Sequence, residues 1–238
     1  MLKAVRTNLK LLLRFIIPPL CIACEQEIDD GLLCGDCYDI IRIVSPPLCQ
    51  ACGRPISDGE VCRACAKARP DFDRLRAWAV FAPPVDKVIH AFKYGNKQSL
   101  AQLLGRSMGR VLQGDTILAT AECVVPVPLY KGRQRDRGYN QALLLCRVLS
   151  QETAKPVLDC LVRTRNTPTQ TKLTDADRRD NVAGAFRLGN DVNVTDKSLL
   201  LIDDVMTTGA TLNECATVLR QAGARSVYAL VSAIASGR

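Results

Sequence analysis

The sequence contains a single histidine, His90, so no second histidine is present to share a metal ion or a proton-transfer step with it. We therefore expect His90 to be an ordinary residue on the face of a helix. The pattern G-x-x-x-x-G-K-[ST] is missing as well, which excludes the phosphate-binding loop of the common nucleotide hydrolases. The apolar stretch near the N-terminus is interrupted by Arg14 and ended by Pro18. It is too short to cross a bilayer, and we expect no transmembrane segment.

Acidic residues are missing from residues 1–17, which contain four basic ones. Apolar residues recur at helical spacing between these charges, which predicts an amphipathic helix packed on the rest of the protein. No small-residue cleavage site follows this segment, so we expect no secretion signal. We expect a cytoplasmic protein, with attachment of this helix to the periphery of a membrane as the alternative.

Negative charge is the scarcer sign, with 24 Asp and Glu against 32 Lys and Arg and a formal net charge of +8. An excess of positive charge fits a polyanionic partner or a phosphate-rich substrate. A basic protein that is merely soluble would show the same excess. Charge alone therefore does not choose between these possibilities.

Cysteine is abundant, and eight of the twelve cysteines form four Cys-x-x-Cys pairs between residues 21 and 65. The segment repeats itself, because PPLCIAC at 18–24 reappears as PPLCQAC at 46–52. The same period of 28 residues carries Cys34 to Cys62 and Cys37 to Cys65. A repeat of this kind predicts two copies of one structural module.

Each repeat supplies four thiolates, the number that closes a tetrahedral shell around a structural zinc ion. A segment this short has too little apolar core to fold alone, and metal binding, worth about 10–16 kcal/mol per site, would supply the folding free energy. Disulfides, an iron–sulfur site and an interleaved pairing of the first and third cysteine pairs are the alternatives. We expect two zinc sites, formed by Cys21, Cys24, Cys34 and Cys37, and by Cys49, Cys52, Cys62 and Cys65.

The pattern changes after Pro70, where the cysteine pairs stop and strand-like apolar runs alternate with helical spacing. We expect strands over residues 76–81, 123–129, 198–204 and 226–235, and helices over residues 85–94, 98–113, 139–152 and 209–223. The alternation predicts an α/β fold with an open, mostly parallel sheet and helices on both faces. The expected organisation is a helix over residues 1–17, a double zinc ribbon over 18–69 and an α/β domain over 70–238.

The segment LLLIDDVMTTGATL, residues 199–212, joins two carboxylates to a threonine-rich loop. Asp203 and Asp204 end a predicted strand, at the edge where ligands of such sheets bind. The helix that begins near Gly209 directs its first N–H groups and its dipole toward the loop, which makes an anion site. The carboxylates would repel a phosphate in contact with them, but they can accept hydrogen bonds from vicinal hydroxyls. A ribose 5-phosphate satisfies both ends at once.

This segment resembles the phosphoribosyl-pyrophosphate loop of type I phosphoribosyltransferases, an apolar strand followed by D-D-x-x-T-T-G-x-T. The stretches VPVPLYKGRQRDRGYNQA and RTRNTPTQTKLTDADRRDNVAGAF resemble the ComF family of competence proteins, including those labelled GntX. That family also carries a zinc ribbon before its transferase-like domain. The resemblance covers roughly residues 15–236 and implies a type I phosphoribosyltransferase-like fold for the sheet.

The resemblance also implies a role for each part of the site. The catalytic carboxylates that hold the ribose hydroxyls would be Asp203 and Asp204. The 5-phosphate would be bound by Thr207, Thr208, Gly209, Ala210 and Thr211. The turn after Val127-Pro128 would be the pyrophosphate loop, with the basic residues Lys131, Arg133, Arg135 and Arg137. A mobile flap would begin at Arg163 and carry Arg165, Lys172, Arg178 and Arg179.

The two basic loops also suit pyrophosphate on chemical grounds, because guanidinium and ammonium groups bind polyphosphates. A solvated surface or a DNA-binding face is the alternative. The resemblance implies a protein that binds phosphoribosyl pyrophosphate with Mg²⁺ and acts in DNA uptake or DNA use, with an acceptor that no residue identifies. The other hypothesis is a non-catalytic accessory protein that senses a sugar phosphate or grips a nucleic-acid end. Its zinc ribbons would dock partners, such as single-stranded DNA or a DNA-uptake helicase.

Overall fold

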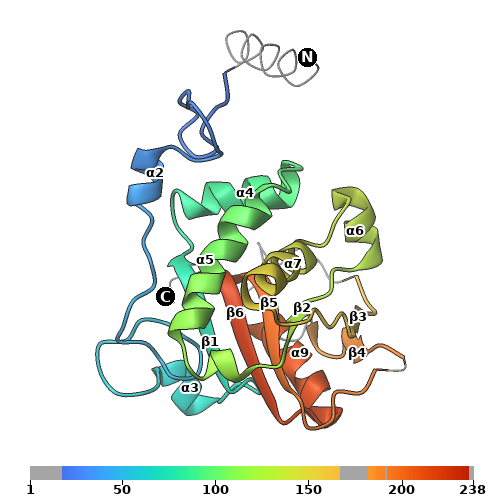
Figure 1. The fold of residues 1–238 in the computed structure, drawn as a ribbon. Helices are drawn as coiled ribbons and strands as arrows, with labels where there is room; N and C mark the ends of the chain where they lie inside the picture. The colour runs from blue at the N-terminus through green and yellow to red at the C-terminus, as the bar shows by residue number, and fades with distance from the viewer. Residues whose placement is uncertain (1–17, 167–181, 191, 236–238) are drawn as a thin grey trace.

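The computed structural model describes residues 18–166, 182–190 and 192–235 (Figure 1). The expected helix over residues 1–17 lies outside this range. Among the residues that are described, no helix has both the length and the hydropathy that a membrane crossing requires.

Four parallel strands form the central sheet, in the spatial order β1-β6-β5-β2. Their bounds are Arg74–Val80 for β1, Cys123–Pro126 for β2, Ser198–Met206 for β5 and Ser226–Ile234 for β6. β5 lies inside the sheet, where Leu201 is paired with Val125 of β2 and Ala229 of β6. The structure confirms the open parallel sheet, which accommodates near-continuous apolar runs because helices cover both of its faces.

Helices α4, α5 and α7 pack on one face of this sheet and α9 on the other, while α6 stands beside it (Figure 1). Their bounds are Val85–Tyr94 for α4, Leu100–Gly114 for α5, Lys131–Arg137 for α6, Gln141–Thr153 for α7 and Ala210–Gln221 for α9, and a 3-10 turn, η1, spans Leu118–Thr120. Leu200 and Ile202 of β5 join the apolar layer formed by α4, α5 and α7. Leu199 and Leu201 join the layer formed with α9. Successive residues of β5 therefore face different layers.

The stretch after β2 differs from the expectation. We expected a strand to residue 129 and then a pyrophosphate loop, but β2 ends at Pro126 and the basic residues lie on the helix α6. The segment K-G-R-Q-R-D-R is helical rather than extended, because its long side chains tolerate a helix and its surroundings decide the conformation, while its role toward pyrophosphate stays a prediction. Gly138 ends the helix in a left-handed conformation, with φ of 80°, and its N–H donates to the carbonyl of Gln134 at 2.8 Å.

A small antiparallel pair, β3 (Leu161–Arg163) and β4 (Phe186–Leu188), was not expected. Each strand has only three residues, too few to show a period in the sequence. Most of the expected flap, including Lys172, Arg178 and Arg179, lies outside the described residues.

The two cysteine repeats fold as copies of one another, each closed by a short helix, α2 (Gly35–Asp39) or α3 (Arg63–Lys67). The backbone N–H of Cys21 donates to the carbonyl of Gln26 at 2.8 Å, and Cys49 donates to Arg54 at the same distance. Their surroundings differ, because the first ribbon stands away from the sheet while the second lies beside β1 (Figure 1).

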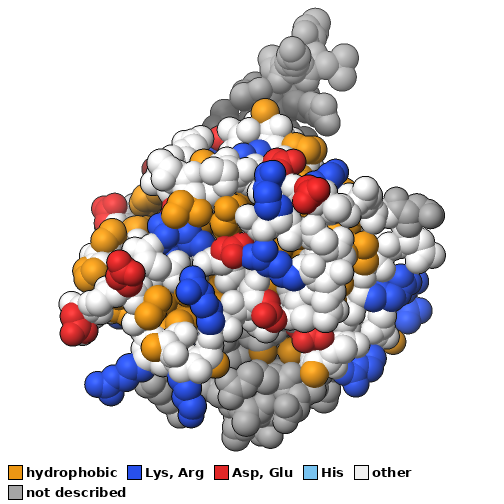
Figure 2. All heavy atoms as spheres, turned by 90° about the horizontal axis from the view of Figure 1, so that it is seen from below, with side chains coloured by type: hydrophobic (Ala, Val, Ile, Leu, Met, Phe, Trp, Pro, Cys, Tyr) orange, Lys and Arg blue, Asp and Glu red, His pale blue; other side chains and the backbone are white. Residues whose placement is uncertain are grey.

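Charged side chains of both signs are interspersed over the face seen in Figure 2, with small apolar groups between them. The positive excess of the chain is therefore not gathered into one patch on this face. A binding site for an anion has to be sought in local geometry.

Candidate functional site

The carboxylates of Asp203 and Asp204 leave β5 on opposite faces of the sheet, as the alternation of the strand requires. β5 continues for two residues beyond them, to Met206, and pairs there with Ile234. Asp204 is buried beneath the α4 layer, while Asp203 lies on the α9 side and is partly exposed. Two adjacent acids therefore have different surroundings.

Asp204 forms an ion pair with Lys93 at the end of α4, with 2.7 Å between Nζ and Oδ1. The Asp204 side chain is 8% exposed and that of Lys93 is 25% exposed. Burial alone would lower the pKa of Lys93, but the attraction of Asp204 outweighs it and raises that pKa. Lys93 is therefore charged at neutral pH.

Asp203 has a pKa near neutrality. Burial of its carboxyl and repulsion by Asp204 raise the pKa to about 7, against the opposing attraction of Lys93. The backbone N–H of Asp204 also donates to Oδ1 of Asp203 at 2.8 Å, which favours the charged form. A carboxyl poised in this way can accept hydrogen bonds from hydroxyls when ionised and changes protonation in the physiological range.

The threonine loop turns the chain from β5 into α9. Gly209 takes a left-handed conformation at the start of the helix, with φ of 84°, which a side chain would disfavour. The hydroxyl oxygen of Thr208 accepts a hydrogen bond from the N–H of Ala210 at 3.3 Å. Ala210 and Thr211 form the first turn of the helix, as expected. The loop therefore has the geometry of an anion site at a helix N-terminus.

A basic cavity of about 580 Å³ lies between the end of α4 and the helix α6. Its lining includes Lys93, Tyr94, Arg133, Arg135 and Arg137. Arg137 donates to the Tyr94 hydroxyl at 3.1 Å, and its guanidinium lies 4.8 Å from the centre of the tyrosine ring. Burial, followed by the charge of Arg137, lowers the pKa of Arg133. Cations crowded in this way favour a polyanion as the ligand. Lys131 is exposed at the start of α6 and is absent from this lining.

Arg163 lies between Asp203 and the basic helix α6. Burial and the charge of Arg133 lower the pKa of Arg163, and Cys215 and then Asp203 partly offset them. These mutual effects place Arg163 within electrostatic range of both Arg133 and Asp203. Its guanidinium also lies 5.2 Å from the centre of the Phe186 ring. Arg165 instead donates to the carbonyl of Ala183, so its described contact lies within the β3–β4 unit.

The eight paired cysteines form two clusters, and the sulfurs of each lie within 4.8 Å of one another. Each cluster comes from one repeat, so the structure does not support the interleaved arrangement, and none of the cysteines forms a disulfide. Tetrahedral zinc with bonds of about 2.3 Å needs sulfurs about 3.8 Å apart. Cys24 and Cys34 lie 3.7 Å apart and Cys52 and Cys62 lie 3.6 Å apart, which fits this metal.

The thiols of the two clusters are also prepared for metal. Burial alone would raise the pKa of Cys21 and Cys49, but N–H groups that donate to their sulfurs lower it to about 6 and about 7. Among these donors are the N–H groups of Cys34 at 3.4 Å and Cys62 at 3.3 Å. Thiolates, which are the form that zinc binds, are therefore favoured at one corner of each cluster.

Comparison with known proteins agrees with the ribbons and shows the family of the chain. The Double zinc ribbon domain family matches residues 12–66. Competence protein F of Haemophilus influenzae is 36% identical over 214 residues, which cover 87% of this chain and 87% of that protein. The chain belongs to the ComF family. DNA utilization protein YhgH of Escherichia coli K12 is 35% identical over 167 residues. The aligned residues cover 68% of this chain and 73% of that protein.

Among solved structures, glutamine phosphoribosylpyrophosphate amidotransferase from B. subtilis is similar to this ComF-family chain. The match covers 56% of this chain and 26% of that one, with a TM-score of 0.38 and 20% identity. A similarity this distant adds nothing about activity, so the site has to be argued from its own residues.

Sequence analysis of this ComF-family chain missed Lys93, Tyr94 and Arg54. A lysine and a tyrosine at the end of a helix carry no signal of their own, because cations are common there. Arg54 lies in the second ribbon and donates to the carbonyl of Thr207 in the threonine loop at 2.5 Å. Only the difference between the repeats, Glu25-Gln26 against Gly53-Arg54, could have drawn attention to it.

Proposed function

We propose that this ComF-family protein binds phosphoribosyl pyrophosphate with Mg²⁺ and that this binding serves the uptake or use of DNA. One observation carries the proposal: Asp203, Asp204, the threonine loop and the basic helix meet at one edge of the sheet. Lys93 pairs with Asp204 and lines the basic cavity, while Arg163 interacts with both Asp203 and Arg133. The carboxylates, which accept hydrogen bonds from hydroxyls, therefore lie between the threonine loop and the basic helix, which both bind anions.

The chemistry of the ligand matches this division. The ribose hydroxyls would donate to the carboxylates of Asp203 and Asp204, and the N–H groups and hydroxyls of the threonine loop would hold the 5-phosphate. The pyrophosphate would face the cations of α6 and Arg163. The relatives named for competence and for DNA utilisation support the link to DNA.

A transfer reaction at this site would break the bond between carbon 1 of the ribose and the pyrophosphate oxygen, and an acceptor would form the new bond. The carboxylates would stabilise positive charge on the ribose ring, and the guanidinium groups would stabilise negative charge on the departing pyrophosphate. Mg²⁺, when bound with the ligand, would neutralise further negative charge of the pyrophosphate. The flap residues Arg163 and Arg165 would add donors at the same edge.

Calorimetric titration of phosphoribosyl pyrophosphate, with and without Mg²⁺, tests the proposal. We expect binding by the wild-type protein and a loss of roughly tenfold or more in Asp203→Asn with Asp204→Asn, because amides accept hydroxyl hydrogen bonds less strongly than carboxylates. Asp39→Asn is the matched control, since Asp39 is an exposed acid at the end of α2. Absence of binding at every Mg²⁺ concentration would overturn the proposal.

A non-catalytic role of the same pocket is the second candidate function. The first ribbon favours it, because Leu20, Tyr38, Ile40 and Ile43 leave apolar surface exposed, as a docking partner would require. The pocket would then sense the ligand, and the partner would be single-stranded DNA or a DNA-uptake helicase. Measuring pyrophosphate release separates the two roles. Transformation that persists in the double variant at normal protein level would instead exclude any role of the pocket in DNA uptake.

A further inference from the structure

The second zinc ribbon makes contacts that its copy does not. At the two positions after the first Cys-x-x-Cys pair, the first ribbon has Glu25 and Gln26, both exposed. The second ribbon has Gly53, which is buried, and Arg54, which is half-buried. Backbone conformation is conserved between them, since φ is 63° at Glu25 and 68° at Gly53. The two ribbons therefore differ in the contacts of the side chains at positions 26 and 54.

Arg54 reaches the threonine loop. Its Nη2 donates to the carbonyl oxygen of Thr207 at 2.5 Å, across 153 positions of the chain. A charged donor makes one of the stronger hydrogen bonds in proteins. Thr207 lies between the acidic end of β5 and Gly209, so this hydrogen bond acts on the middle of the loop.

The segment that follows the second ribbon holds the helix after the loop. The backbone N–H of Asp71 donates to Oδ1 of Asn213 at 2.7 Å, and Oδ2 of Asp71 accepts from the Thr217 hydroxyl at 2.5 Å. Asp73 forms an ion pair with Arg220 on the same helix. Loop and helix are therefore both tied to the ribbon and its linker.

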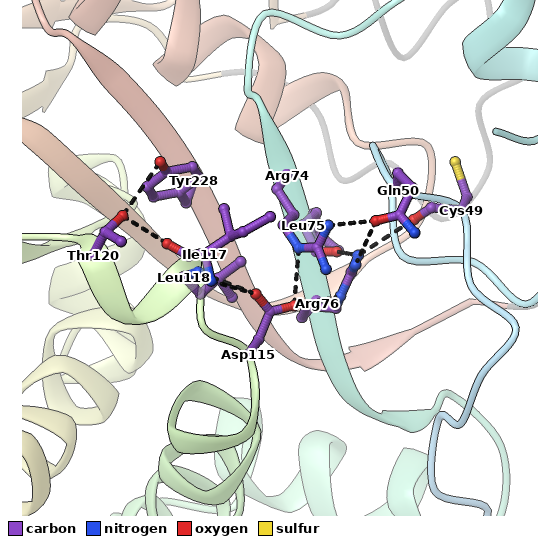
Figure 3. Close-up of polar contacts among 10 residues, drawn as sticks. All are labelled: Cys49, Gln50, Arg74, Leu75, Arg76, Asp115, Ile117, Leu118, Thr120 and Tyr228. Carbon is purple, nitrogen blue, oxygen red and sulfur yellow. Dashed lines mark hydrogen bonds and ion pairs between the residues drawn. The ribbon is translucent and has the colours of Figure 1, made fainter. Parts of the chain in front are cut away.

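The ribbon is itself fixed to β1. The N–H of Leu75 donates to the carbonyl of Ala51 at 2.6 Å, and a Cβ on Gly53 would lie 2.5 Å from the Leu75 carbonyl oxygen. Figure 3 shows the other anchor, where Arg74 and Arg76 each bind Oδ2 of Asp115 at 2.9 Å and extend to Gln50 and the Cys49 carbonyl. Cys49 is also a predicted zinc ligand, so the metal site and the anchor share a residue.

We propose that the second zinc ribbon is a brace that holds the threonine loop ready for its ligand, with Arg54 as the positioning residue. The ribbon spans the distance from β1 to Thr207, and the zinc cluster fixes the backbone from which Arg54 extends. The first ribbon has the same fold without this contact. The brace is a property of the protein without ligand, and its effect on affinity rests on the proposed function.

Hydrogen–deuterium exchange tests the brace without any ligand. We expect Arg54→Ala to increase exchange in peptides covering residues 203–213, because the loop loses its fixed carbonyl. Gln26→Ala, the same position in the first ribbon, should leave those peptides unchanged. Arg54→Lys keeps a charged donor and should restore part of the protection. Zinc content and thermal unfolding, measured on each variant, identify any variant that has lost the ribbon itself.

A titration with phosphoribosyl pyrophosphate and Mg²⁺ then measures the consequence. We expect Arg54→Ala to bind roughly tenfold more weakly than wild type, the effect of one charge-assisted hydrogen bond. If the wild type does not bind, the proposed function fails, but the exchange comparison still decides whether the brace exists. If Arg54→Ala keeps its zinc and shows wild-type exchange in residues 203–213, the brace is overturned.

Discussion

The two zinc ribbons have the same ligand spacing and share their main backbone hydrogen bonds, yet they occupy different places in the molecule. Cys49, Ala51 and Cys52 of the second ribbon are buried in the apolar layer shared with α9. In the first ribbon Cys24 is exposed, and Ile40, just after α2, is 62% exposed. Duplication of a metal-folded module therefore gave one copy that is part of the core and one that presents surface.

The difference between the ribbons indicates that metal binding and tertiary packing make separate contributions to the structure of each ribbon. Zinc bound at each cluster would stabilise its ribbon locally, because all four thiols of each cluster come from one repeat. Packing then decides whether a ribbon can influence a distant site. The second ribbon contacts the threonine loop through the hydrogen bond of Arg54.

The largest effect should come from removing one zinc ligand from the second ribbon. Cys65→Ser exposes core positions of the second ribbon, so we expect the melting temperature to fall by about 10 °C or more, with zinc content near one per chain. Cys37→Ser should lose the same amount of zinc with a shift of only a few degrees. Scanning calorimetry with metal analysis measures both. Equal shifts in the two variants would show that the ribbons are equivalent in the fold.

A smaller effect should follow from exchanging one residue between the copies. Gly53→Glu introduces a Cβ 2.5 Å from the backbone oxygen of Leu75, which should cost about 2–4 kcal/mol of unfolding free energy. Glu25→Gly relieves a positive φ at an exposed position and should change stability by at most about 1 kcal/mol. Urea denaturation measures both values. A Gly53→Glu protein as stable as wild type would contradict the close packing of the second ribbon on β1.

The smallest effect concerns pH. The pKa of Asp203 is about 7, so its charge grows between pH 6 and pH 8, and binding of phosphoribosyl pyrophosphate should strengthen about tenfold over that range relative to Asp203→Asn. The raised pKa of Asp203 has the opposite effect on the free energy of unfolding. The stability that protonated Asp203 contributes is complete below the pKa of the carboxyl in the unfolded chain, and it is lost as pH rises through 7. Cys37→Ser should keep the wild-type pH profile, since the first ribbon does not reach the loop. A binding profile that is the same for wild type and Asp203→Asn would exclude Asp203 as the titrating group.

The sequence was sufficient for those features in which a local pattern has one physical solution. The 28-residue period assigned each set of four cysteines, and the apolar runs ending in Asp203-Asp204 located a strand at the site. The order of the strands and the presence of α6 could not be predicted in this way. Helical and loop conformations of a short charged segment differ little in free energy, and its surroundings decide between them.

Contacts between residues far apart in the chain could not be predicted from the sequence either. Lys93 and Asp204 are 111 positions apart, and Arg54 and Thr207 are 153 positions apart. Nothing local distinguishes a lysine that pairs with a buried acid from one that faces water. The roles of Asp203, the threonine loop, α6 and the flap residues stay predictions until a ligand is tested.

The opposite orientation of Asp203 and Asp204 has a mechanical consequence. Asp204 lies on the side of the apolar layer that contains α4, α5 and α7, and Asp203 lies on the side of the layer that contains α9 and part of the second ribbon. The two layers touch the same strand but lie on different sides of it. A sugar held by both carboxylates would contact both layers at once, so a bound ligand would oppose their separation at this edge of the sheet.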